Sequence, residues 1–131
     1  MAYVMNDGGK AATGRKGKSG DCAVRAVAIA TGTDYETAYR MMADEAASFG
    51  YKKSARDGIH MDVITSVLKK FGWAWVAAPK ISGRKARCAD LAEKGTVIAR
   101  QAKHFVAVID GTPHDIFDCS DRMVYGCWAK A

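Results

Sequence analysis

The sequence predicts an α+β fold, in which helices fill the first half of the chain and an antiparallel sheet fills the second half. The length of 131 residues corresponds to one domain that spans residues 1–131. Apolar side chains recur at helical spacing from residue 22 to residue 71. Runs of β-branched and aromatic residues begin at residue 96, where the period changes to that of strands. Because helices come first and strands follow, we expect the helices to pack on one sheet.

Residues 1–20 are polar, basic and rich in glycine, which predicts a loop or arm. Residues 22–31 are apolar on all sides apart from Arg25, a pattern typical of a buried central helix. Asp21 or Ser19 is expected to cap the start of this helix.

Two further helices are expected before the sheet. Thr33 and Glu36 form a capping box that opens a helix reaching about residue 48. Residues 61–71 place apolar side chains at helical spacing and form the third helix. Beyond it the sequence predicts a strand, a basic loop, a short helix and four more strands, at residues 73–77, 78–87, 88–94, 96–100, 104–110, 114–118 and 123–128.

Composition and charge exclude several classes of protein. Apolar residues account for 49% of the chain and charged residues for 26%, so neither a disordered chain nor a fibrous repeat is expected. No apolar run approaches the roughly 18 residues of a membrane span, and the N-terminus lacks the apolar core of a secretory signal. We therefore expect no membrane partner and a cytoplasmic location. The net charge of +6 permits binding to nucleic acid, which is not otherwise favoured.

Cys22 is the strongest candidate for a reactive side chain. It stands at the first turn of the predicted buried helix, directly after a glycine-containing loop. The unpaired backbone N–H groups and the macrodipole at a helix start favour a thiolate, which is the nucleophilic form of cysteine. The alternative interpretation is a small buried apolar residue, because cysteine is among the residue types most often found in a protein core.

His104 and a following carboxylate complete the candidate site. His104 begins a strongly apolar strand, which puts its side chain at the rim of the sheet. Pairing of Ile109 with Pro113 across a three-residue loop would bring Asp118 opposite this histidine. A carboxylate there can fix the tautomer and orientation of the imidazole. A slip of one residue would break this placement, and Asp115 is then the alternative orienting residue.

The order of the candidate residues along the chain is that of cysteine hydrolases: a cysteine at a helix start, then a histidine at a strand start, then an acidic residue on the next strand. The chain resembles the papain-like cysteine peptidase superfamily, with double-glycine leader peptidases and cell-wall amidases or peptidases as analogues. More specifically, it resembles an uncharacterised group of small phage and prophage proteins over most of its length. The motifs that carry this resemblance lie at residues 6–9, 20–32, 103–111 and 124–128. The resemblance implies a central helix bearing Cys22, packed on an antiparallel sheet bearing His104.

The resemblance leaves the stabilisation of an oxyanion open. Papain-like peptidases place a glutamine or a similar donor a few residues before the cysteine, and this sequence has none there. The backbone N–H of Cys22 can supply one donor. The candidates for the second donor are Asn6, Ser19 and Lys18. Asn6 is preferred because the turn that follows it can fold its amide back, although a plain turn-forming role explains it equally well.

Arg25 and Asp21 are expected to have structural rather than catalytic roles. Asp21 fits the role of a helix cap. An arginine in so apolar a helix needs a charged partner, so an ion pair with Asp21 or Asp118 is expected, and contact with a substrate carboxylate is the alternative.

No metal or organic cofactor is expected. His114, Cys119 and Cys127 fit no common spacing of zinc ligands. The run at residues 17–19 is similar to the end of a phosphate-binding loop, but the first glycine of that motif and the preceding apolar strand are missing.

The predicted function is that of a cysteine hydrolase of the peptidase or amidase type. Cys22 is the nucleophile, His104 the general base and then acid, and Asp118 the residue that orients His104. The substrate is a peptide or protein, whose acyl group passes through a thioester. The alternative is a non-enzymatic, phage-encoded module that uses the same scaffold to bind and redirect a host protein. Either partner would be met in the cytoplasm of a bacterial host.

Overall fold

Three α-helices occupy the first half of the chain: α1 (Cys22–Thr31), α2 (Tyr35–Ser48) and α3 (Met61–Lys70). The computed structural model describes residues 2–15, 21–55 and 59–130. Helix α1 has the predicted bounds, and six consecutive residues from Ala23 to Ala28 are buried. Its length and its burial follow from its almost continuous apolar sequence, which leaves no side to face water.

The start of α2 differs from the predicted capping box. The N-cap residue is Asp34, whose side chain accepts a hydrogen bond from the Thr37 backbone N–H at 3.1 Å. Thr33 instead makes a 2.8 Å hydroxyl contact with Thr31. Aspartate and threonine both cap helices well, and here the residue closer to the first turn takes the position.

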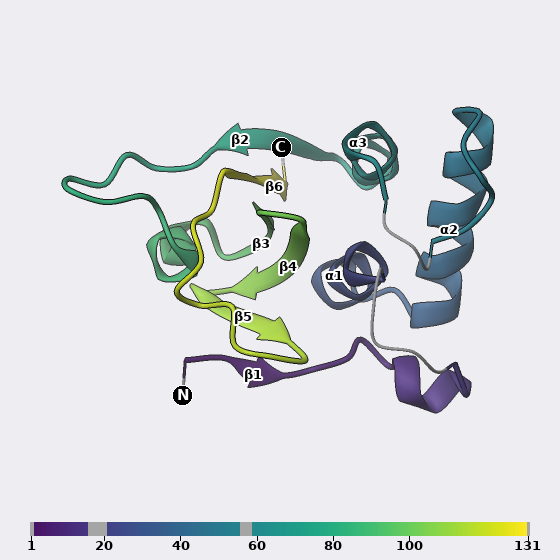
Figure 1. Ribbon diagram of the computed structural model, residues 1–131, viewed down its shortest axis with the longest axis horizontal. Coiled ribbons are helices and arrows are strands. Elements are labelled where there is room, and N and C mark those ends of the chain that lie inside the picture. Colours follow the sequence, from purple (N-terminus) through teal and green to yellow (C-terminus); the bar gives the residue numbers. More distant parts are fainter. Residues whose placement is uncertain (1, 16–20, 56–58, 131) are drawn as a thin grey trace.

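The second half of the chain supplies most of a six-stranded sheet. The strands are β1 (Val4–Met5), β2 (Trp73–Ala77), β3 (Thr96–Gln101), β4 (His104–Ile109), β5 (Thr112–Asp115) and β6 (Gly126–Lys130). They lie in the order β1-β5-β4-β3-β6-β2 (Figure 1). The sheet is mixed rather than purely antiparallel, because β1 runs parallel to β5. The predicted strand at residues 123–128 is shifted toward the C-terminus, and its first residues form part of a loop.

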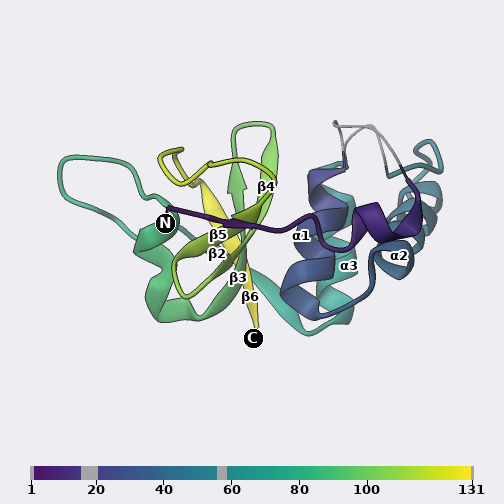
Figure 2. The same ribbon diagram turned by 90° about the horizontal axis from the view of Figure 1, so that it is seen from below.

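The helices divide between two sides of the sheet. The three α-helices lie together on one side, and the 3-10 helix η2 (Cys88–Lys94) lies on the other (Figures 1 and 2). Two hydrophobic clusters correspond to these two sides. Phe105 of β4 belongs to the α-helical cluster, whereas its neighbour Val106 belongs to the cluster around η2. Adjacent strand residues point to opposite faces, so both faces of β4 are buried.

The N-terminal segment is more regular than the predicted loop or arm. Besides β1 it contains a short 3-10 helix, η1 (Lys10–Thr13). The Asn6 backbone N–H donates to the carbonyl of Asp115 at 2.9 Å, which continues the pairing of β1 with β5. A segment with few apolar side chains is thereby fixed by backbone hydrogen bonds to a strand far away in sequence.

The β4–β5 hairpin has a tighter turn than predicted. Ile109 pairs with Thr112, not with Pro113, and only Asp110 and Gly111 form the loop. Both loop residues have positive φ, 51° and 85°, as in the turns that match the twist of a two-residue hairpin. The register therefore differs from the predicted one by a single residue, and this difference decides which carboxylate meets His104.

Candidate active site

Cys22 is the first residue of α1 and is partly exposed. The first N–H groups of a helix have no partner within the helix, so a negative charge on the Cys22 sulfur would lie in a favourable field. The other three cysteines, Cys88, Cys119 and Cys127, are buried, and none of the four forms a disulfide. Cys22 is thus the thiol that a reagent in solution can reach.

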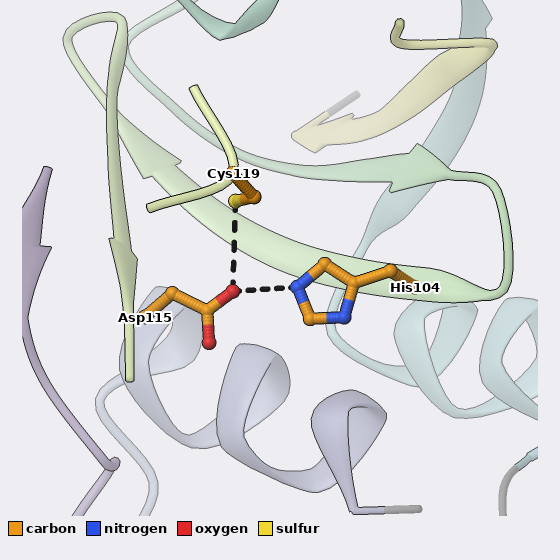
Figure 3. A group of neighbouring side chains, drawn as sticks. All are labelled: His104, Asp115 and Cys119. Carbon is orange, nitrogen blue, oxygen red and sulfur yellow. Dashed lines mark hydrogen bonds and ion pairs between the residues drawn. The ribbon is translucent and has the colours of Figure 1, made fainter. Parts of the chain in front are cut away.

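His104 forms a close pair with Asp115. Its Nε2 atom lies 2.5 Å from Asp115 Oδ2, and both residues are more than nine-tenths buried (Figure 3). The pairing follows from the hairpin register. Ala107 pairs with His114, so Asp115 aligns with Val106, which shares a face of β4 with His104 two residues away. This diagonal neighbour position lets the carboxylate reach the imidazole.

Asp118 does not pair with His104, contrary to the predicted register. Strand β5 ends at Asp115, and the Asp118 side chain is exposed. Its carboxylate accepts hydrogen bonds from the backbone N–H and the hydroxyl of Ser120, at 2.9 and 2.6 Å. Asp118 therefore stabilises a turn, and Asp115, the alternative orienting residue, occupies the position beside the imidazole.

The electrostatics of the His104–Asp115 pair favour its charged form. Burial lowers the pKa of His104, but interactions with Asp115, Cys119 and Cys22 outweigh burial and hold it well above the ordinary value. Burial likewise opposes ionisation of Asp115, yet its contact with His104, the Ile116 backbone N–H and the charge of Arg25 keep its pKa below the ordinary value. The pair is thus an imidazolium and a carboxylate, with the Cys22 thiol close enough to affect the imidazole.

The described contacts of the Asn6 side chain are with Gly8 and His114. Its Oδ1 atom accepts a hydrogen bond from the Gly8 backbone N–H at 2.9 Å, which forms a local turn. Its Nδ2 atom lies 3.5 Å from His114 Nδ1. These contacts support the turn-forming role of Asn6 and direct its amide toward β5. The other two candidates for this donor, Ser19 and Lys18, lie outside the described residues. The same holds for residues 17–19, the run similar to the end of a phosphate-binding loop.

Cys119 is a member of this cluster that the sequence did not single out as a catalytic candidate. Its Sγ atom lies 3.5 Å from Asp115 Oδ2, on the same oxygen that meets His104 (Figure 3). A hydrogen bond with Cys88 and burial both raise the pKa of the Cys119 thiol, so Cys119 stays protonated and donates to the carboxylate. Asp115 ends β5 and Cys119 lies in the loop that follows, a spacing that gives no signal in the sequence.

The three side chains also resemble a metal-binding set. His104, Asp115 and Cys119 each offer one donor atom within 4.8 Å of the others. Two ligands of a tetrahedral zinc ion lie ~3.4 Å apart for one nitrogen and one oxygen donor. The 2.5 Å separation between the imidazole nitrogen and the carboxylate oxygen is shorter and is that of a direct hydrogen bond. The observed geometry therefore fits an acid–base pair better than a zinc site.

The zinc set considered from the sequence is dispersed over the sheet. His114 lies on β5 and Cys127 on β6, and β4 and β3 separate these strands. Strand spacing of about 4.8 Å puts the two backbones roughly 14 Å apart.

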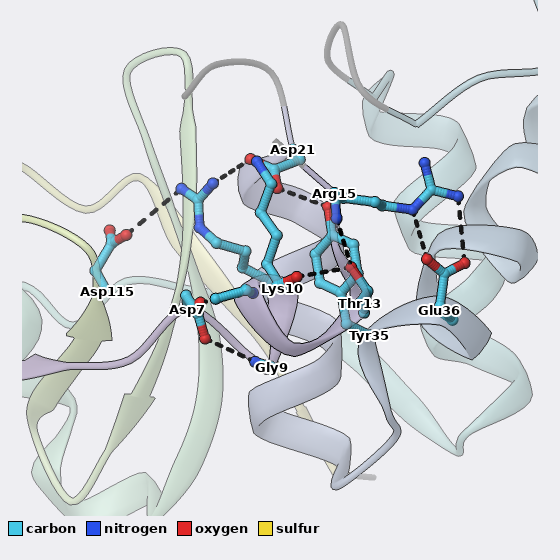
Figure 4. A network of polar contacts seen from close by, with 11 residues as sticks. Asp7, Gly9, Lys10, Thr13, Arg15, Asp21, Tyr35, Glu36 and Asp115 are labelled. Carbon is cyan, nitrogen blue, oxygen red and sulfur yellow. Dashed lines mark hydrogen bonds and ion pairs between the residues drawn. The ribbon is translucent and has the colours of Figure 1, made fainter. Parts of the chain in front are cut away.

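Arg25 forms the ion pair predicted with Asp21 and a second one that was not predicted. Its guanidinium contacts Asp21 Oδ1, and its Nη2 atom lies 3.5 Å from Asp115 Oδ1 (Figure 4). Asp21 holds the N-cap position of α1, but its side chain makes no capping hydrogen bond. It is bound instead by Arg25, by Lys10 Nζ at 2.9 Å and by the Tyr35 hydroxyl at 2.7 Å.

Comparison with protein-family models, with curated proteins and with solved structures finds no match for this chain. Among the described residues, no helix has both the length and the apolar character needed to span a membrane. The chemistry of the site therefore rests on the geometry of its own side chains.

Proposed function

We propose that the protein is a cysteine hydrolase of the peptidase or amidase type. Cys22 is its nucleophile, His104 its general base and acid, and Asp115 the residue that orients His104. The observation that carries this proposal is the buried His104–Asp115 pair beside a partly exposed thiol at a helix start. A nucleophile next to a base that is itself oriented by a third group is the arrangement used for acyl transfer.

The reaction begins with attack of the Cys22 thiolate on the carbonyl carbon of an amide. The carbonyl electrons move to oxygen, where the backbone N–H of Cys22 at the start of α1 can donate a hydrogen bond. His104 then gives its proton to the leaving nitrogen, the C–N bond breaks, and an amine departs. The acyl group remains on sulfur as a thioester.

Water completes the cycle. Neutral His104 takes a proton from a water molecule that attacks the thioester carbonyl, and the C–S bond breaks to release a carboxylic acid. The thiolate and the imidazolium are thereby restored. Throughout, Asp115 holds the imidazole by its Nε2 atom, which leaves Nδ1 free to exchange protons with sulfur and substrate.

The same three residue types, in the same order along the chain, support the proposed relation to the papain-like superfamily. The α+β architecture, with the cysteine on a helix packed against β4, agrees with that proposal. The proposed substrate is a peptide or protein. Asn6 is not part of the proposed oxyanion site, because its described contacts direct its amide toward His114.

The test is the pH dependence of Cys22 alkylation by iodoacetamide, followed by peptide mass spectrometry. Free thiols lose reactivity below their pKa of about 8.5. In the wild type we expect Cys22 to react readily at pH 6, because the imidazolium stabilises the thiolate. The His104→Ala variant should lose this low-pH reactivity, and Asp118→Asn should keep it. Equal profiles for wild type and His104→Ala would rule out the cysteine hydrolase.

A second candidate function is non-enzymatic binding of an acidic host or phage protein. The observation in its favour is a pocket of about 520 Å³ between the basic loop after β2 and residues 123–125. Lys80, Arg84 and Lys85 line it together with Ile81 and Tyr125. A binding module should still bind and redirect its host protein when Cys22 is replaced by alanine, whereas a hydrolase should lose its activity.

A further inference from the structure

A chain of alternating charges runs from the N-terminal segment to the candidate site. Lys10 contacts Asp21, Asp21 contacts Arg25 and Arg25 contacts Asp115 (Figure 4). Asp115 in turn contacts His104 (Figure 3). Asp21, Arg25, His104 and Asp115 are 6% exposed or less. Buried charges require partners, and in this row each acidic group lies between two basic ones.

Arg25 is the link that spans two elements. Its guanidinium uses separate terminal nitrogens for Asp21, at the start of its own helix, and for Asp115, at the end of β5. This division suits a planar, forked donor that presents several N–H groups in fixed directions. A lysine ammonium is a compact point charge and cannot reproduce that fork.

The N-terminal segment supports both ends of this link. The Asn6 backbone N–H holds the Asp115 carbonyl at 2.9 Å. Gly8 has φ +70°, and a Cβ atom there would lie 3.3 Å from the Arg25 carbonyl oxygen, so the segment lies directly on α1. The close approach to α1 accounts for the glycine at position 8, where a Cβ atom would crowd the Arg25 carbonyl.

We propose that Arg25 is a positioning residue. It holds the Asp115 carboxylate in place, so that His104 keeps the orientation needed to exchange a proton with Cys22. This inference rests on the proposed hydrolase function. Asp115 Oδ1 is shared between Arg25 and the Ile116 backbone N–H, and this leaves Oδ2 for the imidazole. Without the guanidinium, Oδ1 keeps only the Ile116 backbone N–H, so rotation of the carboxylate about χ2 is less restrained and the imidazole partner is less well fixed.

The charged and titratable groups around this pair are few. His104 faces Asp115, Cys119 and Cys22, and the Phe117 ring lies 5.1 Å from the imidazole ring. Asp115 meets no other basic side chain than His104 and Arg25 among the ion pairs of the described residues. Among these ion pairs Arg25 reaches His104 only through Asp115, while its other partner, Asp21, directly precedes Cys22.

The experiment compares Arg25→Lys with Arg15→Lys. Arg15 also pairs with a carboxylate, Glu36, at 2.6 Å, but this pair has no contact with Asp115. We expect Arg25→Lys to lower the Cys22 alkylation rate at pH 6 about tenfold, which corresponds to about 1.4 kcal/mol of lost stabilisation of the reactive form. The rate at pH 9, where thiols ionise without help, should change less than twofold. Arg15→Lys should match the wild type at both pH values.

A folded Arg25→Lys variant with the wild-type pH profile would overturn the proposal. If this variant does not fold, Tyr35→Phe provides the second test, because it removes only the 2.7 Å hydrogen bond that holds Asp21 beside Arg25. We expect it to lower the rate at pH 6 by about twofold relative to that at pH 9, and an unchanged ratio counts against the inference. If Cys22 loses its low-pH reactivity in His104→Ala but keeps it in Arg25→Lys and Tyr35→Phe, the positioning role of Arg25 is refuted and the hydrolase is not. No loss in His104→Ala would refute the hydrolase itself.

Discussion

Replacement of Asp115 by asparagine should destabilise the protein strongly, whereas the same change at Asp118 should not. The asparagine side chain has the shape of the native one but carries one oxygen and one NH₂ group. The native carboxylate accepts hydrogen bonds on both oxygens, from His104 on one and from Ile116 and Arg25 on the other. In one orientation of the amide, its NH₂ group faces the Ile116 N–H and Arg25, which are both donors; in the other it faces His104, which must lose its proton to accept a hydrogen bond.

The magnitude follows from the loss of a buried charge that two cations share. Removing one partner of a buried ion pair costs about 3–5 kcal/mol, because the remaining charges stay buried without compensation. We expect about 3 kcal/mol here, since Arg25 keeps its contact with Asp21. With a urea m-value of about 1.5–2 kcal/mol/M, the unfolding midpoint should fall by roughly 1.5–2 M.

The assay is equilibrium unfolding in urea at pH 7, followed by circular dichroism, with Asp118→Asn as the matched control. Asp118 is exposed and accepts from Ser120 through a single oxygen, which asparagine also provides. Its substitution should leave the midpoint within error of the wild type. A larger loss for Asp118→Asn than for Asp115→Asn would refute the assignment of Asp115 as the partner of His104.

Three further outcomes are expected. The folded-state pKa of His104 lies above the unfolded value of about 6.5, so its stabilising contribution is complete below that pH and is lost as the pH rises through the folded pKa. The difference in unfolding free energy between wild type and His104→Gln should therefore shrink from pH 6 to pH 10, and a difference that grows would contradict the charged pair. Gly126→Ala should lower the free energy of unfolding by about 1–3 kcal/mol, because a Cβ atom would overlap the Trp75 ring and lie 2.9 Å from the Val76 carbonyl oxygen; a thermal unfolding midpoint equal to that of the wild type would show that the Trp75 ring and the β2 backbone can both move aside. In the native protein a thiol reagent should modify Cys22 quickly and the three buried cysteines only after unfolding; fast modification of a second thiol would contradict the burial of that residue.

The candidate site could be predicted in part from local chemistry. Cys22 stands where the sequence puts it, because an apolar, alanine-rich stretch between a polar loop and Gly32 can only form a short buried helix. The position of His104 at the first residue of a strand likewise follows from the β-branched run behind it. The need of Arg25 for a carboxylate partner was equally evident from the apolar helix around it.

The choice between Asp115 and Asp118 depended on the length of one turn. The Asp110-Gly111 pair is a strong local signal for a two-residue hairpin, so this register was within reach of the sequence. The predicted three-residue loop shifts the pairing of every β5 residue with β4 by one position. A shift of one residue exchanges the two faces of a strand.

The sequence by itself determined the α+β order of elements, the bounds of α1, β2 and η2, and the placement of a cysteine at a helix start. These features depend on interactions between residues close along the chain, such as periodic apolar side chains and helix ends. Only the tertiary structure decided that β1 joins the sheet in parallel, and that Arg25 connects Asp21 to Asp115. It also decided that Cys119 shares the carboxylate with His104. Such contacts join elements separated by tens of residues, and their register depends on how the helices and the sheet pack together rather than on local preference.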